Sequence, residues 1–440
     1  MSTYHIAGGT PLFGSVRLGG AKNASFKLMI ASLLADSPSR LLNFSHISDV
    51  EMVARLITSL GGKATEIGDR AYVIDPRSFH SHVISASTAE VSRASTMFIP
   101  ALVARFGKAI VPFPGGDKIG NRPLERHFDG LKALGMNIRT EGNAIVVDAQ
   151  ELQGTTYRFE KNTHTGTETL IMAAVKAKGK TRLENVALET EIDDLIRFLN
   201  QMGAKITRLP DRVIEIEGVD HLSGAIHTIM PDQNQAVSYA CAALATQGDV
   251  IVEGALSNSL ESFLKKLDDI GAGYEVGNFG IRFFYKGELR ATDVTTEPAP
   301  GFKTDWQPLW VTMMTQATGV SILHETVYES RFAYADALKE MGASIEFFNP
   351  SVNNPDEVYN FNLADEKLGA VHAARILGPS HLHGGEFTVK DLRHGATLMI
   401  AGLIAAGETI LHDPEHQIDR GYEKLHEKLV KMGAKIEVSD

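Results

Sequence analysis

The chain has 440 residues, of which 43% are hydrophobic and 22% charged, a balance typical of a folded globular protein rather than a disordered or membrane protein. Its length predicts two or three domains. The net charge of -11 argues against non-specific nucleic-acid binding, which needs a net basic face. Without an N-terminal leader pattern or a long apolar run, the sequence favours a cytoplasmic protein with no membrane anchor.

The sequence also offers few residues that could form a metal site. A single cysteine, Cys241, excludes disulfides within the chain and a zinc-cysteine site, and its apolar surroundings predict an inert core residue. The histidines that invite a metal interpretation are His381, His383, His412 and His416. They share no register that supplies three ligands, so we expect no metal and no cofactor.

A short phrase recurs six times along the chain. It contains a glycine after an amphipathic helical pattern and before an alternating, strand-like stretch. The six glycines are Gly61, Gly135, Gly203, Gly271, Gly342 and Gly433. Helix, glycine C-cap and hairpin is the local structure that this pattern predicts.

A second, more uniformly apolar helix is expected upstream of each glycine, and such helices are buried. In chain order these helices are expected at residues 23–35, 94–106, 167–178, 234–247, 306–318 and 394–406. The sequence therefore predicts six α/β repeats of about 70 residues, each a βαβαββ unit, divided three and three between two domains. The last repeat has about 20 additional residues after Gly342, and we interpret them as a surface insertion.

Charged and polar residues gather where the predicted helices begin. The residues before the buried helices include Lys22, Asn23, Arg93, Thr165, Gly166, Asp232, Asp305 and Arg393. Arg122, Arg331 and Arg420 precede outer helices. Helix N-termini favour anions, and arginine binds carboxylate and phosphate in a planar, bidentate manner, so these groups predict a site for a small molecule carrying both.

The segments GGAKNAS, GGDKIGNRP, FKTD, ETVYESRF, DLR and IDRGYE resemble, in order and spacing, the UDP-N-acetylglucosamine 1-carboxyvinyltransferases of the enolpyruvyl transferase family. The resemblance covers essentially the whole chain. It implies two inside-out α/β domains, residues 22–229 and residues 1–21 plus 230–440, with the active site in the cleft between them. It also implies transfer of the carboxyvinyl group of phosphoenolpyruvate to the 3-hydroxyl of UDP-N-acetylglucosamine, the first committed step of peptidoglycan precursor synthesis.

The resemblance also implies roles for individual residues. The expected phosphoenolpyruvate ligands are Lys22, Arg122 and Arg420 at the phosphate, and Arg331 and Arg393 at the carboxylate. The expected contacts of the sugar nucleotide are Asn23, Arg93, Arg122, Pro123, Leu124, Lys161, Thr165, Gly166, Asp305 and Val327. The expected catalytic residues are Asp117, Asp305, Lys22 and Arg420.

Two aspartates are the expected proton acceptor and proton donor of the reaction. Asp305 is the candidate acceptor of the hydroxyl proton, with a helix N-cap as the alternative. Asp117 stands where many family members have a cysteine proposed as the general acid, and a turn residue is the alternative. A carboxylate at this position also predicts resistance to fosfomycin, an epoxide that alkylates the cysteine.

Three departures from the family pattern concern the acceptor: Lys161–Glu168, Glu125 and Asp232–Tyr239. Transfer to 3-phosphoshikimate, or to another nucleotide, is therefore an alternative reaction. A non-enzymatic alternative is an inactive paralogue that binds a UDP-sugar, although joint retention of Lys22, Asp305 and the arginines favours the enzyme. The sequence does not fix the oligomeric state.

Overall fold

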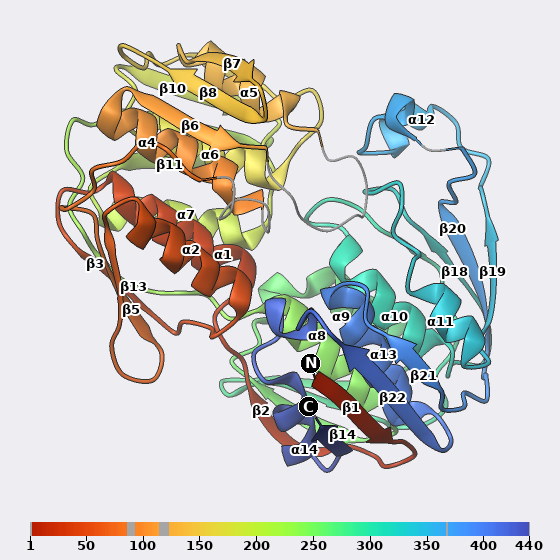
Figure 1. Ribbon diagram of the computed structural model, residues 1–440. Helices are drawn as coiled ribbons and strands as arrows, with labels where there is room; N and C mark the ends of the chain where they lie inside the picture. Colours follow the sequence, from red (N-terminus) through yellow and green to blue (C-terminus); the bar gives the residue numbers. More distant parts are fainter. Residues whose placement is uncertain (1, 86–92, 114–122, 367, 440) are drawn as a thin grey trace. The chain divides into compact units, whose positions relative to one another are not determined.

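The structure is a computed structural model that describes residues 2–85, 93–113, 123–366 and 368–439. It divides into two compact units. The terminal unit runs from the chain start to Gly19 and again from Pro231 onward, and the middle unit runs from Gly20 to Met230, apart from the undescribed residues. In Figure 1, the first strand, drawn in red, lies among the blue elements of the chain end.

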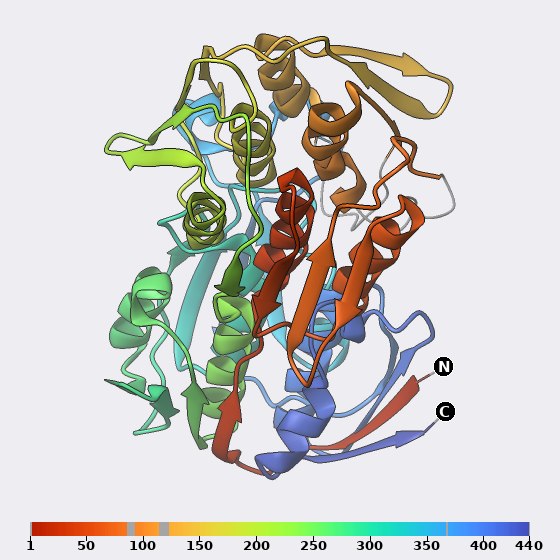
Figure 2. The same cartoon turned by 90° about the vertical axis from the view of Figure 1, so that its left-hand side faces the viewer.

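Each unit contains three small sheets on one plan, in which a parallel pair at one edge is continued by antiparallel strands. In the terminal unit the sheets are β21 (Glu386–Thr388), β22 (Glu408–Asp413), β1 (Ser2–Ala7), β23 (Lys435–Ser439); β2 (Phe13–Arg17), β14 (Asp249–Glu253), β16 (Gly280–Phe284), β15 (Gly273–Gly277); and β17 (Val294–Thr295), β18 (Gly319–His324), β20 (Ala373–Gly378), β19 (Ser344–Phe348). Figure 2 shows both chain ends at the same end of the first of these sheets, where Thr3 pairs with Ser439.

The middle unit repeats the plan. Its sheets are β13 (Ile226–Thr228), β3 (Ser39–Leu42), β5 (Ala71–Asp75), β4 (Lys63–Glu66); β9 (Thr156–Arg158), β10 (Lys180–Glu184), β12 (Val213–Glu217), β11 (Lys205–Leu209); and β6 (Lys108–Pro112), β8 (Ala144–Asp148), β7 (Asn137–Glu141). In the last sheet the parallel partner of β6 is an isolated bridge between Val83 and Ile110. The βαβαββ repeat predicted from the sequence is therefore confirmed.

Six apolar helices form the interior of the units. They are α1 (Lys22–Ala31), α4 (Ile99–Phe106) and α6 (His164–Ala174) in the middle unit, and α8 (Gln233–Ala245), α10 (Gln307–Met314) and α13 (Leu392–Ile404) in the terminal unit. Every residue of α8 is buried, Cys241 included. Helices α8, α10 and α13 pack against one another, so the helices lie within the unit as an inside-out α/β fold requires.

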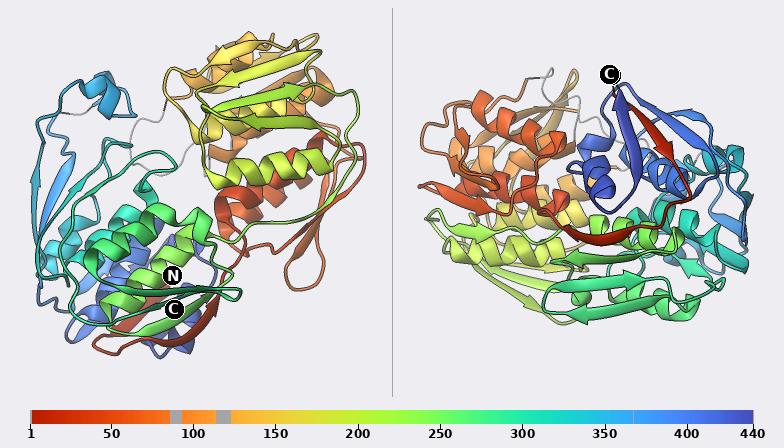
Figure 3. Two further views of the ribbon diagram at one scale, coloured as in Figure 1. Left: turned by 180° about the vertical axis from the view of Figure 1, so that it is seen from behind. Right: turned by 90° about the horizontal axis from the view of Figure 1, so that it is seen from below.

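The outer helices expose one face. They are α2 (Ser48–Ser59), α5 (Glu125–Ala133), α7 (Thr190–Gln201), α9 (Glu261–Ile270), α11 (Ala335–Glu340) and α14 (Leu425–Lys431). The six glycines after these helices all have positive φ, between 78° and 106°, as the sequence predicted for C-terminal caps. In the views of Figure 3, strands of each unit lie outside its apolar helices.

Short helices occupy the connections. They are η1 (Ser32–Leu34), η2 (Arg93–Phe98), η3 (Ser257–Ser259), η4 (Thr304–Trp306), α12 (Pro355–Val358), η5 (Leu363–Asp365) and η6 (Ile418–Arg420). Several of them immediately precede an inner or outer helix, where the polar residues predicted to bind substrate are found.

Candidate active site

Three predicted site residues of the terminal unit form one polar cluster. Arg331 Nη2 donates a 2.6 Å hydrogen bond to Asp305 Oδ1, and Arg393 Nη2 lies 3.4 Å from Asp305 Oδ2. The Asp305 side chain is 31% exposed, whereas those of Arg331 and Arg393 are 5% and 12% exposed. The carboxylate is thus accessible while its cationic partners are largely buried.

Asp305 is not a helix N-cap. The cap of η4 is Lys303, and no side chain makes a capping hydrogen bond there. Instead, the Asp305 carboxylate also accepts a 3.4 Å hydrogen bond from Asn234 Nδ2 on α8. Asp305 is therefore placed by side chains from α8, from α13 and from the loop after β18, and its carboxylate remains accessible.

Arg393 is fixed in place from a second side. Its Nη1 donates a 2.8 Å hydrogen bond to the Tyr422 hydroxyl, which lies 2.9 Å from Ser238 Oγ on α8. Burial lowers the pKa of Arg393, but Tyr422, Asp305 and Asp232 together raise it above its ordinary value. Arg393 therefore remains a cation despite its burial, as binding of an anion requires.

A buried glutamate organises the loop that carries Arg331. Glu325 is fully buried, and one of its oxygens accepts hydrogen bonds from the backbone N–H groups of Val327 (2.8 Å) and Tyr328 (3.1 Å). The other oxygen accepts a 2.8 Å bond from Thr304 Oγ1, next to Asp305. Burial raises the pKa of Glu325, and Arg331 offsets this only in part.

An aspartate has the same role in the loop that carries Arg420. Asp413 is fully buried at the end of β22 and accepts bonds from the backbone N–H groups of Gln417 (2.7 Å) and Ile418 (3.0 Å). Arg420 lies in η6 and donates a 2.8 Å bond to Gln417 Oε1. Neither Glu325 nor Asp413 was identified from the sequence, although each is an acidic residue beside the end of a strand.

In the middle unit, Lys22 begins helix α1 and is held by an acidic partner. Its Nζ lies 2.7 Å from Asp49 Oδ2 on α2, with the two side chains 15% and 10% exposed. Asn23 follows it and is half-buried. Asp49 was also missed, because its pairing joins two helices that sequence periodicity treats separately.

The start of α6 brings together other predicted acceptor contacts. Thr163 is the N-cap, and its side chain accepts a 3.4 Å bond from the Gly166 N–H. A Cβ atom on Gly166 would lie 2.3 Å from the Thr163 methyl group, so this position admits glycine alone without rearrangement. Thr165 Oγ1 lies 2.9 Å from His127 Nε2, and Lys161, which precedes the cap, is half-buried.

A buried charged cluster lies beneath this helix start. Lys27 of α1 forms an ion pair with Glu168 of α6, and both side chains are almost completely buried. His164 Nε2 lies 3.0 Å from Lys27 Nζ and 3.3 Å from Glu168 Oε1. Burial lowers the pKa of His164, but Glu168 and Glu189 together raise it above its ordinary value. This cluster ties the N-terminal turns of α1 and α6 together.

Five predicted residues remain, of which the structure describes three. Pro123 and Leu124 are half-buried immediately before α5, and Arg93 begins η2. Asp117 and Arg122 lie outside the described residues.

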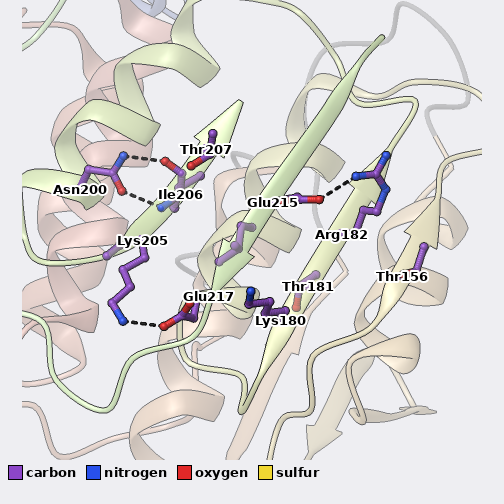
Figure 4. Close-up of a pocket in the computed structure, with 12 residues that line it drawn as sticks. Thr156, Lys180, Thr181, Arg182, Asn200, Lys205, Ile206, Thr207, Glu215 and Glu217 are labelled. Atoms are coloured by element: carbon purple, nitrogen blue, oxygen red, sulfur yellow. Dashed lines mark hydrogen bonds and ion pairs between the residues drawn. The ribbon is translucent and has the colours of Figure 1, made fainter. Parts of the chain in front are cut away.

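A groove of about 570 Å³ lies elsewhere in the middle unit, over sheet β11–β12–β10–β9 (Figure 4). No predicted site residue lines it. Two of its three lining cations are paired with lining carboxylates, Arg182 with Glu215 at 2.7 Å and Lys205 with Glu217 at 2.5 Å. Because most of its positive charge is already paired and it lacks the arginine cluster predicted to bind phosphoenolpyruvate, we do not assign the reaction to it.

Within the described ranges, no three His, Cys, Asp or Glu side chains are placed to hold a metal ion. No helix in that part of the chain is long and apolar enough to cross a bilayer.

Comparison with known proteins is informative over the whole chain. The family model described as EPSP synthase (3-phosphoshikimate 1-carboxyvinyltransferase) matches residues 6–429. The chain is 38% identical over 436 residues to the UDP-N-acetylglucosamine 1-carboxyvinyltransferase of Halothermothrix orenii, with 99% of each chain covered. It is 40% identical over 436 residues to UDP-N-acetylglucosamine 1-carboxyvinyltransferase 3 of Caldanaerobacter subterraneus, again with 99% of each covered.

Solved structures share the fold. The enolpyruvyl transferase NikO from Streptomyces tendae aligns with a TM-score of 0.84 at 24% identity, covering 100% of this chain and 99% of the other. EPSP synthase from Acinetobacter baumannii aligns with a TM-score of 0.74 at 18% identity, with both chains fully covered. These likenesses confirm the predicted inside-out two-domain α/β architecture.

Proposed function

The chain belongs to the EPSP synthase family of enolpyruvyl transferases, and on that premise we propose that it transfers the carboxyvinyl group of phosphoenolpyruvate to the 3-hydroxyl of UDP-N-acetylglucosamine. The observation that carries the proposal is an accessible carboxylate, Asp305, paired with two largely buried arginines, in a chain similar along its whole length to such transferases. The product would be a peptidoglycan precursor made in the cytoplasm.

The reaction is an addition followed by an elimination. The acceptor hydroxyl loses its proton as its oxygen bonds to C2 of phosphoenolpyruvate, and C3 gains a proton to give a tetrahedral ketal. The bond from C2 to the phosphate oxygen then breaks, a proton leaves C3, and the carboxyvinyl ether and phosphate remain. The enzyme must therefore hold a dianion, accept one proton and supply another.

The structure of the terminal unit supports different roles for Asp305 and for the two arginines paired with it. Arg331 and Arg393 would bind the carboxylate of phosphoenolpyruvate through their planar guanidinium groups. In the structure both are occupied by Asp305, so substrate binding would replace part of that interaction. Asp305, released in part from its cations, would become a better acceptor for the hydroxyl proton.

The phosphate of phosphoenolpyruvate would be bound by Lys22, Arg122 and Arg420. Lys22 extends from the first turn of α1, where the helix dipole adds to the positive potential. Asp49 fixes the ammonium group before substrate arrives. Asp117 would supply the proton to C3, which requires that its carboxyl group be protonated.

The acceptor would contact Asn23, Arg93, Pro123, Leu124, Lys161, Thr165, Gly166, Asp305 and Val327, with Arg122 shared between the two substrates. The described members of this set lie at helix starts or in the loops that follow strands. The backbone at Gly166 is fixed by the Thr163 cap, and that at Val327 by the buried Glu325 carboxylate. Such pre-organised groups can orient a sugar hydroxyl toward C2.

The test is phosphate release from phosphoenolpyruvate by the purified protein with each candidate acceptor in turn. Release that requires UDP-N-acetylglucosamine supports the proposal. Release that requires 3-phosphoshikimate, the acceptor named by the matching family model, would replace it with the alternative reaction. No release with any acceptor, together with tight binding of the UDP-sugar, would identify a non-catalytic binding protein.

A further inference from the structure

The connection between β19 and β20 departs from the plan of the other repeats. Corresponding hairpins are joined by residues 67–70, 142–143, 210–212 and 278–279, whereas β19 and β20 are joined by residues 349–372, here called the inserted segment. Figure 1 shows it extending past the ends of the two strands with α12 at its tip. The expectation of a surface insertion is correct for most of the segment, but Tyr359, Phe361 and His372 are buried.

An aromatic cluster anchors the buried part. Tyr359, Phe361 and His372 are 5%, 6% and 4% exposed, and their rings lie with centroids 4.9 to 5.2 Å apart. The Tyr359 hydroxyl lies 3.2 Å from His324 Nε2 on β18. These ring contacts bury part of the inserted segment and hold it against the sheet that contains β18, β19 and β20.

Two backbone hydrogen bonds then join the inserted segment to the loop that follows β18. The Glu325 N–H donates to the His372 carbonyl at 2.7 Å, and the Asn360 N–H donates to the Thr326 carbonyl at 2.8 Å. Asn349 Oδ1 accepts a 2.9 Å bond from the His372 N–H, which fixes the end of the segment. Consecutive residues of the loop are thus held by two separate parts of the insertion.

The held residues lie next to the proposed acceptor contacts. Glu325 accepts from the N–H groups of Val327 and Tyr328 and from Thr304, which precedes Asp305. A shift at Glu325 or Thr326 would consequently move Val327. Arg331 is anchored separately by its 2.6 Å bond to Asp305, so it should respond less.

We propose that the inserted segment is a positioning element for the acceptor, in which Tyr359 and the backbone of Asn360 fix the loop bearing Val327 and so select the sugar nucleotide. This inference rests on the proposed function. It names residues that influence the choice of acceptor without contacting the substrate. In the corresponding part of the other repeats, the two strands are joined by a short turn.

The test removes one hydrogen bond from the full-length protein. Asn360→Pro deletes the N–H that reaches Thr326, and the backbone of Tyr359, with φ of -88° and ψ of 129°, already suits a residue before proline. Asn360→Ala keeps the N–H and is the matched comparison. Asp356→Ala, on the exposed helix α12, controls for a change elsewhere in the segment.

We expect the KM for UDP-N-acetylglucosamine to rise at least about tenfold in Asn360→Pro relative to Asn360→Ala, with the KM for phosphoenolpyruvate changed by less than about twofold. Amide exchange at Val327 and Tyr328 should accelerate in the same variant. If the proline variant is too unstable to assay, Tyr359→Leu, which keeps an apolar side chain but removes the ring and hydroxyl, must show the same split.

The outcomes separate this inference from the proposed function. A wild-type protein that releases no phosphate with UDP-N-acetylglucosamine refutes the proposed function itself. An active wild type whose Asn360→Pro and Tyr359→Leu variants keep the acceptor KM, or raise both KM values equally, overturns the positioning role. Equal effects would show that the insertion contributes stability alone.

Discussion

Replacing Asp305 by asparagine tests the most specific chemical role in the proposed site. Asparagine keeps the size of the side chain and an oxygen that can accept the Arg331 bond, now 2.6 Å long, but it cannot accept a proton. Loss of a general base typically costs 10² to 10⁴ in rate, which corresponds to about 3 to 5 kcal/mol of transition-state stabilisation. We therefore expect kcat to fall by about 100-fold or more.

The same variant should fold. The substitution leaves the charges of Arg331 and Arg393 without their carboxylate, but Asp305 is 31% exposed, so solvent screens part of the loss. Because Arg331 and Arg393 are themselves largely buried, we estimate a destabilisation of about 3 kcal/mol, and kcat is therefore expressed per folded protein as given by the urea titration. Asp269→Asn, which removes a surface ion pair with Lys266, is the matched control.

The assay is steady-state phosphate release, with the free energy of unfolding measured by urea titration on the same preparations. The KM for phosphoenolpyruvate should stay the same or decrease, because Arg331 and Arg393 no longer exchange a carboxylate partner. An Asp305→Asn variant that keeps more than about a tenth of wild-type kcat would refute the assignment of Asp305 as the proton acceptor.

Three further predictions concern other parts of the site. Lys22→Ala or Arg420→Ala should lower kcat/KM for phosphoenolpyruvate by about 30-fold or more, because each removes a charge-assisted contact worth about 2 to 4 kcal/mol; a change within about twofold contradicts the phosphate assignment. The intact mass of the protein after incubation with fosfomycin and UDP-N-acetylglucosamine should show no adduct, because Cys241 is buried and burial raises the pKa of its thiol. The Asp117→Cys variant should be alkylated under the same conditions. An adduct on the wild-type protein would contradict this prediction. Burial raises the pKa of Glu325 above its ordinary value of 4.5, so the folded chain retains a proton that the unfolded chain has released, and the free energy of unfolding should fall as pH rises through that interval. Glu325→Gln should reduce this slope in urea titrations at several pH values, and an unchanged slope would show that Glu325 is not its source.

Local chemistry explains why much of the fold was predictable. A glycine at positive φ after an amphipathic helix is a local requirement, and it recurs at Gly61, Gly203 and Gly433 with the same backbone geometry. The apolar helices were predictable for the same reason, because a helix such as α8 that is apolar on every face must be buried.

The supporting residues of the site were not predictable in this way. Asp49, Glu325 and Asp413 act through partners fixed by tertiary structure, and their sequence neighbourhoods resemble ordinary strand ends or helix starts. The same holds for the pairing of Asp305 with Arg331, which are far apart in sequence. From its local sequence alone, Asp305 fitted a helix N-cap better than a proton acceptor, whereas the structure pairs it with Arg331 and makes Lys303 the cap.

The inserted segment shows a third case. The extra length of this repeat predicted a surface insertion, and the exposed helix α12 agrees with that prediction. Tyr359 and Phe361 are nevertheless buried, because they pack on His372 from the other end of the same segment. Such closure depends on how the two ends meet and has no signature in a single stretch of sequence.

Identification of the product distinguishes carboxyvinyl transfer to UDP-N-acetylglucosamine from the alternative reactions. Purified protein is incubated with phosphoenolpyruvate and UDP-N-acetylglucosamine, and the nucleotide product is analysed by mass spectrometry and NMR alongside phosphate release. We expect one carboxyvinyl ether at the sugar 3-hydroxyl for each phosphate released. Phosphate release without that ether, or a carboxyvinyl group transferred only to 3-phosphoshikimate, would contradict it.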